Sequence, residues 1–167
     1  PDYCAGHSIG EYSALYGVGS LDIESTIKLA QLRGNIMSEI SNKNPGKMAA
    51  IMGLSPEKID EVCESINGIV SGVNYNSELQ TVISGEEKAV LEACEKLKNE
   101  GARKVVLLKV SGGFHSELMK EAGEQLKEKL DDFNFLESNI KIVSNTKAEI
   151  LNNVEENRKS TLLNPVT

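Results

Sequence analysis

The stretch Gly6-His7-Ser8-Ile9-Gly10 places a serine between two glycines near the start of the chain. This Gly-x-Ser-x-Gly pattern is typical of a nucleophile elbow, a sharp strand-to-helix turn that holds the serine in a strained, exposed position. Residues 3–5 can end the strand, and residues 11–17 can form the helix. The N–H of Ile9, at the start of that helix, is suited to stabilise the negative oxygen formed during acyl transfer. Ser8 is therefore predicted to be a nucleophile, with a glycine-rich turn of no catalytic role as the alternative.

A serine nucleophile needs a base, and the sequence offers two histidines, His7 and His115. His7 is adjacent to Ser8, so its side chain should point away from the nucleophile in an elbow. His115 lies in Gly112-Gly113-Phe114-His115-Ser116, a loop at the head of a predicted helix, and is the better candidate. The alternative is an ordinary residue at a helix N-terminus.

An acidic third member of a catalytic triad cannot be identified by spacing. The acids that follow His115 resemble solvated charges of turns or helix ends: Asp131, Asp132 and Glu137. A Ser–His dyad oriented by a backbone carbonyl is therefore an alternative to a triad.

Beyond the elbow, helical periodicity predicts a helix over residues 21–40, and turn residues at 41–46 mark a boundary. Six elements follow in the order strand, helix, strand, strand, helix, strand, at residues 47–54, 56–66, 69–74, 80–84, 86–100 and 103–110. This order predicts a ferredoxin-like βαββαβ subdomain at residues 44–110, inserted between residues 1–43 and 111–167. A buried strand is expected at 140–144, and the polar tail at 155–160 is expected to be exposed.

Composition excludes several classes of function. A net charge of −7 argues against a nucleic-acid-binding surface. No apolar run approaches the roughly 20 residues that cross a bilayer, and the first residues do not resemble a secretory signal. The cysteines Cys4, Cys63 and Cys94 form no C-x-x-C pair, so we expect reduced thiols, no metal site and a cytoplasmic protein.

Arg33 places a cation on the apolar face of the predicted helix at 21–40. A buried guanidinium needs a partner, and its planar fork suits a carboxylate. On spacing alone, a structural ion pair and a site for a substrate carboxylate both remain open.

Several stretches together resemble the malonyl-CoA:acyl carrier protein transacylase family of fatty acid and polyketide synthesis. They occur in family order: Gly6 to Leu15, Arg33-Gly34, Lys47 to Leu54, Asn74-Tyr75-Asn76 with Gln80, Phe114-His115-Ser116-x-Leu118-Met119, Ser144-Asn145 and Asn164-Pro165-Val166. The resemblance implies an α/β fold in which the ferredoxin-like subdomain is inserted into an α/β-hydrolase-like core. It also implies transfer of malonyl from coenzyme A to the phosphopantetheine thiol of acyl carrier protein.

The resemblance also assigns roles to residues. Ser8 is implied as nucleophile, His115 as general base, the Ile9 amide as one oxyanion donor and Arg33 as the clamp for the malonyl carboxylate. Asn74 and Asn76 are implied to line the substrate cleft. Ile9 and Phe114 resemble malonyl-selective members of the family.

Malonyl-CoA is the expected substrate, acyl carrier protein the expected partner and a monomer the expected state, with no cofactor beyond the coenzyme A thioester. Departures from the family pattern include Gly113 where proline is common, and Glu78-Leu79 where Pro-Gly is usual. The family's N-terminal Gly-Gln-Gly segment and the C-terminal segment that orients the histidine are not found, so we expect a central fragment. A serine hydrolase such as a thioesterase, or an inactive fragment that serves as an interaction module, are the alternative functions.

Overall fold

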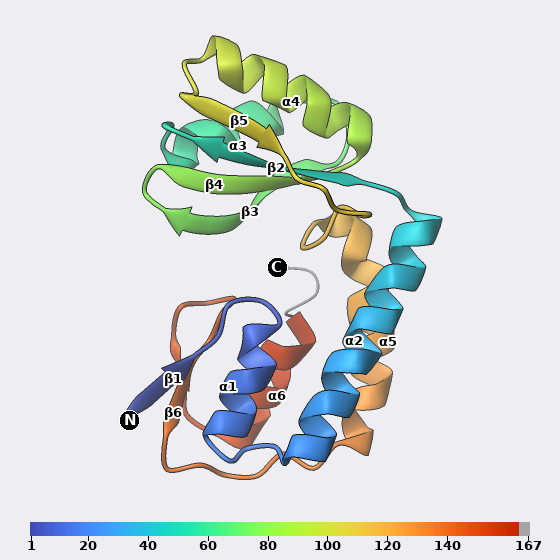
Figure 1. Cartoon of the computed structure of the whole chain (residues 1–167), viewed down its shortest axis with the longest axis vertical. Helices are drawn as coiled ribbons and strands as arrows, with labels where there is room; N and C mark the ends of the chain where they lie inside the picture. Colours follow the sequence, from blue (N-terminus) through green and yellow to red (C-terminus); the bar gives the residue numbers. More distant parts are fainter. Residues whose placement is uncertain (164–167) are drawn as a thin grey trace. The chain divides into compact units, whose positions relative to one another are not determined.

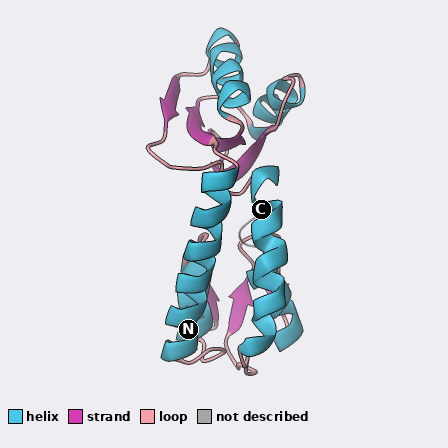
Figure 2. Ribbon diagram, turned by 90° about the vertical axis from the view of Figure 1, so that its right-hand side faces the viewer, coloured by secondary structure: helices cyan, strands magenta, loops and turns pink. Residues whose placement is uncertain are grey.

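The computed structural model describes residues 1–163, so the family-like stretch Asn164-Pro165-Val166 lies outside the described residues. Helices and strands are mixed along the chain (Figures 1 and 2), which confirms the predicted α/β class. The described residues form two compact units, unit 1 from residues 1–36 and 121–163 and unit 2 from residues 37–120. The division into domains at 44 and 110 stays a prediction. No helix of residues 1–163 combines the length and the apolar character needed to cross a membrane.

Unit 2 contains the predicted βαββαβ order. Its elements are β2 (Lys47–Met52), α3 (Pro56–Glu64), β3 (Val70–Ser77), β4 (Gln80–Gly85), α4 (Glu87–Asn99) and β5 (Lys104–Leu107). The strands form one antiparallel sheet in the order β3-β4-β2-β5. Each helix therefore connects two strands that have a third strand between them, as in a ferredoxin-like module.

The sheet of unit 2 is buried on both faces because β2 alternates its side chains between two clusters. Ala49 and Ile51 pack in the larger cluster with apolar residues of α3 and α4, both of which cover one face of the sheet (Figure 1). Met48 and Ala50 pack in a smaller cluster on the other face. Phe114 is partly buried against this second cluster, so the sheet supports the loop that carries His115.

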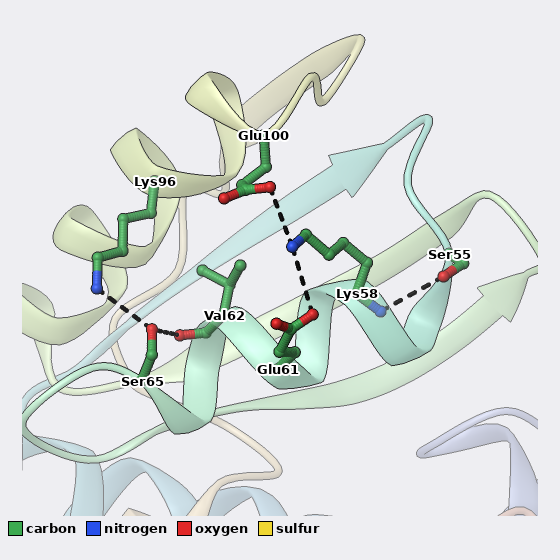
Figure 3. Close-up of polar contacts among 7 residues, drawn as sticks. All are labelled: Ser55, Lys58, Glu61, Val62, Ser65, Lys96 and Glu100. Carbon is green, nitrogen blue, oxygen red and sulfur yellow. Dashed lines mark hydrogen bonds and ion pairs between the residues drawn. The ribbon is translucent and has the colours of Figure 1, made fainter.

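Polar contacts at the surface join α3 to α4 (Figure 3). Lys58 of α3 lies between two carboxylates, with its Nζ 3.0 Å from Glu100 Oε2 and 3.3 Å from Glu61 Oε2. Lys96 of α4 donates to Ser65 Oγ across 3.2 Å. Exposed ion pairs contribute little to stability, so the apolar cluster beneath them holds the two helices.

Unit 1 holds a small sheet in the order β1-β6-β7. Its elements are β1 (Tyr3–Ala5), α1 (Gly10–Gly17), the first part of α2 (Ile23–Lys43), most of α5 (Lys120–Lys129), the short helix η2 (Leu130–Asp132), β6 (Lys141–Val143), β7 (Ile150–Leu151) and α6 (Val154–Leu163). β1 and β6 lie side by side (Figure 1) and are parallel, with Ala5 opposite Val143. Because they are parallel, their carboxyl ends meet at one edge of the sheet.

Two predictions about the last third of the chain differ from the structure. The tail expected to be exposed at 155–160 belongs to helix α6, in which Glu155 and Lys159 are exposed but Asn157 and Ser160 are buried. Hydrogen bonds make that burial possible, since Ser160 Oγ lies 2.9 Å from Ser144 Oγ and Thr161 Oγ1 donates to Asn157 O across 2.9 Å. His115 also does not open a helix: the short helix η1 (Glu117–Met119) and then α5 follow it.

Candidate active site

The turn between β1 and α1 has the geometry of the predicted nucleophile elbow. Ser8 has a φ of 50°, in the left-handed region, which costs a non-glycine residue about 1–2 kcal/mol. A Cβ on Gly6 would lie 2.0 Å from the carbonyl oxygen of Gly10, so the turn closes only with glycine at position 6. His7 is exposed, whereas Ser8 is half-buried.

Backbone hydrogen bonds tighten the elbow as it enters α1. Gly10 N donates to His7 O across 2.9 Å, and Glu11 N donates to Ser8 O across 3.1 Å. Ile9 is the N-cap residue of α1, so its own N–H lies outside the intrahelical ladder, at the positive end of the helix. This position suits an oxyanion donor, and that role for Ile9 stays a prediction.

Arg33 reaches the elbow from α2. Its side chain is 6% exposed, and its Nη2 donates a hydrogen bond to Ser8 Oγ across 3.1 Å. Its guanidinium carbon lies 5.8 Å from the ring centroid of Tyr12, a distance that allows a cation–π contact. Nε of Arg33 is buried without a hydrogen-bond partner among the described residues.

The charged side chain of Arg33 is largely shielded from solvent. Burial lowers the pKa of Arg33, and Coulombic attraction to Tyr12 and Glu11 opposes this shift. Burial also raises the pKa of Tyr12, and the Arg33 cation opposes that shift. A cation held in this way gains more from a carboxylate partner than it would in water.

Asn145 contacts the nucleophile, and no role was predicted for it. It follows β6 and accepts a hydrogen bond at Oδ1 from the N–H of Ser8, across 3.0 Å. The feature of the sequence that points to Asn145 is its place in the pair Ser144-Asn145, which resembles the family pattern. A contact between residues 137 positions apart carries no periodicity that could reveal it.

His115 lies in unit 2, where the chain holds it in an unusual conformation. Its φ is 63° and its side chain is 7% exposed. The preceding loop is packed tightly, because a Cβ on Gly112 would lie 2.2 Å from Ser41 Oγ. Ser116 Oγ donates to Gly113 O across 2.6 Å and closes the turn around His115. A right-handed helix cannot include a residue in the left-handed conformation, which explains why the helical segment begins after His115 and not at it.

The remaining predicted residues are divided between the units. Asn74 and Asn76 lie on β3 of unit 2, where the pairing with β4 shifts register twice and leaves Asn76 without a paired residue. Asn74 is half-buried and Asn76 is exposed. The structure thus brings Ser8 and Arg33 together within unit 1, whereas the roles of His115, Asn74 and Asn76 stay predictions.

Glu11 is a buried acid beside the described site, and its charge opposes the lowering of the pKa of Arg33 by burial. Asp131 forms an ion pair with Arg158, which accounts for one of the three acids considered for a triad. Among residues 1–163, no cluster of three or more His, Cys, Asp or Glu side chains could hold a metal ion. A cavity of about 300 Å³ beside the elbow is lined by Ala5 to His7, Val143 to Asn145 and Ala148.

Comparison with known proteins gives a consistent result. The model of the acyl transferase domain family matches residues 1–164. A malonyl CoA-acyl carrier protein transacylase of Bacillus subtilis is 40% identical over 154 residues, which cover 90% of this chain and 49% of that protein. The chain therefore spans about half the length of the curated relatives it matches.

Solved structures resemble the chain over nearly all its length. A malonyl-transacylase in complex with its type II PKS acyl-carrier protein has a TM-score of 0.96 and 37% identity, covering 100% of this chain and 55% of that one. The malonyl CoA-acyl carrier protein transacylase of Coxiella burnetii has a TM-score of 0.95 and 34% identity, covering 99% of this chain and 53% of that one.

Proposed function

Because the chain belongs to the acyl transferase domain family, we propose that it carries the acyl-accepting serine of a malonyl-CoA:acyl carrier protein transacylase. The observation that carries the proposal is the pair formed by Ser8 and Arg33. A strained serine is held at an elbow, and a buried guanidinium donates to its hydroxyl. One group can form an acyl ester, and the other can recognise the free carboxylate that malonyl has and acetyl lacks.

The first half-reaction is acylation of Ser8. The malonyl carboxylate binds Arg33, and Ser8 Oγ attacks the thioester carbonyl while His115 takes the hydroxyl proton. The N–H of Ile9 donates to the oxygen that becomes negative in the tetrahedral intermediate. The C–S bond then breaks, and the coenzyme A thiolate leaves with the proton from His115.

The second half-reaction runs through the same steps with a new thiol. The phosphopantetheine thiol of acyl carrier protein gives its proton to His115 and attacks the malonyl ester. The C–O bond to Ser8 breaks, and the serine oxygen recovers the proton.

No resident cofactor is required in this scheme, because coenzyme A enters as a thioester substrate. A cytoplasmic location would give access to both substrates.

Mass spectrometry of the intact protein after incubation with malonyl-CoA tests the proposal. We expect a malonyl adduct on Ser8 that is absent in Ser8→Ala and that transfers to holo acyl carrier protein. Since the chain spans half of its relatives' length, the same measurement is made on a chimera that adds the flanking segments of the 40% identical relative. Absence of the adduct from both proteins would refute the role of Ser8, and release to water without a thiol acceptor would indicate a hydrolase.

A further inference from the structure

Asn145 stands beside the nucleophile because of the register of the small sheet in unit 1. Ala5 is the last residue of β1 and pairs with Val143, the last residue of β6. The elbow and Asn145 thus leave the same edge of the sheet from neighbouring parallel strands. This placement brings the Asn145 carboxamide within hydrogen-bond distance of the Ser8 amide.

The hydrogen bond fixes the orientation of both groups. A backbone N–H can only donate, so the atom of Asn145 that faces Ser8 must be the carboxamide oxygen. The turn itself uses the carbonyls of His7, Ser8 and Ile9 as acceptors for residues further along the chain. The Ser8 N–H donates instead to the segment that follows β6, where the side chain of Asn145 supplies the acceptor.

Asn145 is in turn held by a rigid turn. The residue before it, Ser144, is 3% exposed, and its Oγ accepts from the backbone N–H groups of Thr146 and Lys147, each across 3.2 Å. The same Oγ lies 2.9 Å from Ser160 Oγ on α6. Ala148 N also donates to Ser144 O across 3.0 Å. The carboxamide therefore projects from a turn that is fixed on both sides.

From these contacts we propose that Asn145 is a positioning residue for acyl transfer. Its carboxamide oxygen holds the Ser8 amide and so maintains the left-handed backbone at Ser8, which presents the hydroxyl and the following Ile9 amide. Ser8 is then fixed at two points, through its backbone by Asn145 and through its oxygen by Arg33. The inference rests on the proposed function, because it assigns the elbow a role in acylation.

The test compares two variants of nearly equal size, Asn145→Leu and Asn145→Asp. Leucine removes the acceptor, whereas aspartate keeps an oxygen at the same place. In single-turnover acylation by malonyl-CoA, we expect Asn145→Leu to lower the maximal rate 10- to 100-fold, with less than a threefold change in half-saturating concentration. Asn145→Asp should recover the rate to within about fivefold of the unsubstituted protein. The matched control is Asn139→Leu, which replaces an exposed asparagine just before the first residue of β6. Its acylation rate should equal that of the unsubstituted protein.

A second readout does not depend on turnover. Hydrogen exchange of the Ser8 amide should accelerate at least tenfold in Asn145→Leu and stay slow in Asn145→Asp, while exchange in the strands of unit 2 is unchanged. Equal acylation rates and equal exchange in the two variants would overturn the inference. Thermal unfolding measures how much of each variant is folded. If the loss of rate in Asn145→Leu is fully explained by a smaller folded fraction, the inference is also overturned.

The two proposals fail in different ways. If the unsubstituted protein and its chimera take up no malonyl, the proposed function fails. If they take up malonyl and Asn145→Leu does so at the same rate, the proposed function stands and only the role of Asn145 is lost.

Discussion

Arg33 donates a hydrogen bond from Nη2 to the hydroxyl oxygen of Ser8, across 3.1 Å, from a helix that begins fifteen residues after the nucleophile. The contact joins the atom proposed to accept the acyl group to the cation proposed to select it. A substrate carboxylate that binds Arg33 would therefore arrive beside the reacting oxygen. Binding of the substrate would then also orient its thioester for attack, and holding reacting groups together in this way accelerates a reaction.

Replacement of Arg33 by methionine should reduce the preference for malonyl-CoA over acetyl-CoA. Methionine fits a buried apolar site, but it cannot bind a carboxylate. A hydrogen bond to a charged group contributes about 1.5–3 kcal/mol, so kcat/KM for malonyl-CoA should fall about 10- to 100-fold. Arg33→Lys keeps the positive charge but lacks the planar fork of the guanidinium. Its kcat/KM for malonyl-CoA should lie between those of the unsubstituted protein and Arg33→Met. Steady-state kinetics with both thioesters gives the ratio, and an unchanged ratio would rule out Arg33 as the clamp.

Substitution at the two glycines of the elbow should have opposite outcomes. Gly6→Ala places a Cβ 2.0 Å from the carbonyl oxygen of Gly10, a backbone atom that cannot move without opening the turn. We expect a loss of at least about 2 kcal/mol in the free energy of unfolding. Gly10→Ala meets no atom within 4 Å and lies at the start of α1, so its stability should match or slightly exceed that of the parent. Chemical denaturation of both variants checks the contrast.

The extent to which the sequence predicts this site depends on the range of each contact. The elbow and the order of elements in unit 2 follow from glycine spacing and apolar periodicity, which are local properties of the chain. A cation on an apolar helix face predicts that Arg33 needs a partner, but it does not identify Ser8 as that partner. The contact of Asn145 with Ser8 depends on the parallel pairing of β1 with β6, which no local pattern encodes.

Helix α6 shows a second limit of prediction from composition. Residues 155–160 are polar, and polarity predicts an exposed tail. Ser160 and Thr161 are nevertheless buried, because partners on Ser144 and Asn157 satisfy their hydroxyls. Only the folded structure shows that such partners exist, so polarity alone does not reveal that one face of α6 is buried.

The backbone strain at Ser8 can be measured with a pair of inactive variants. Ser8→Ala and Ser8→Gly both remove the hydroxyl and its contact with Arg33. The cost of the left-handed conformation favours glycine, whereas the entropy of the unfolded chain favours alanine. Because Ser8 has a φ of 50°, glycine should be more stable than alanine by about 1 kcal/mol. Thermal unfolding of the two proteins gives the difference. Equal stability, or a more stable alanine variant, would show that the elbow is not strained at this residue.

The thiols of unit 2 should resist modification until the unit unfolds. Cys63 is 3% exposed, and burial together with the nearby carboxylate of Asp60 raises its pKa to about 12. Burial also raises the pKa of Cys94, so both thiols stay protonated at pH 8, whereas alkylation requires the thiolate. Since folding favours the protonated thiol of Cys63, its contribution to stability is complete below the unfolded pKa of about 8.5 and is lost as pH rises towards 12. Iodoacetamide at pH 8 should therefore label Cys4, which is half-buried, before the other two, and all three in denaturant. Peptide mapping identifies the labelled sites, and early labelling of Cys63 in the folded protein would contradict the packing described for α3.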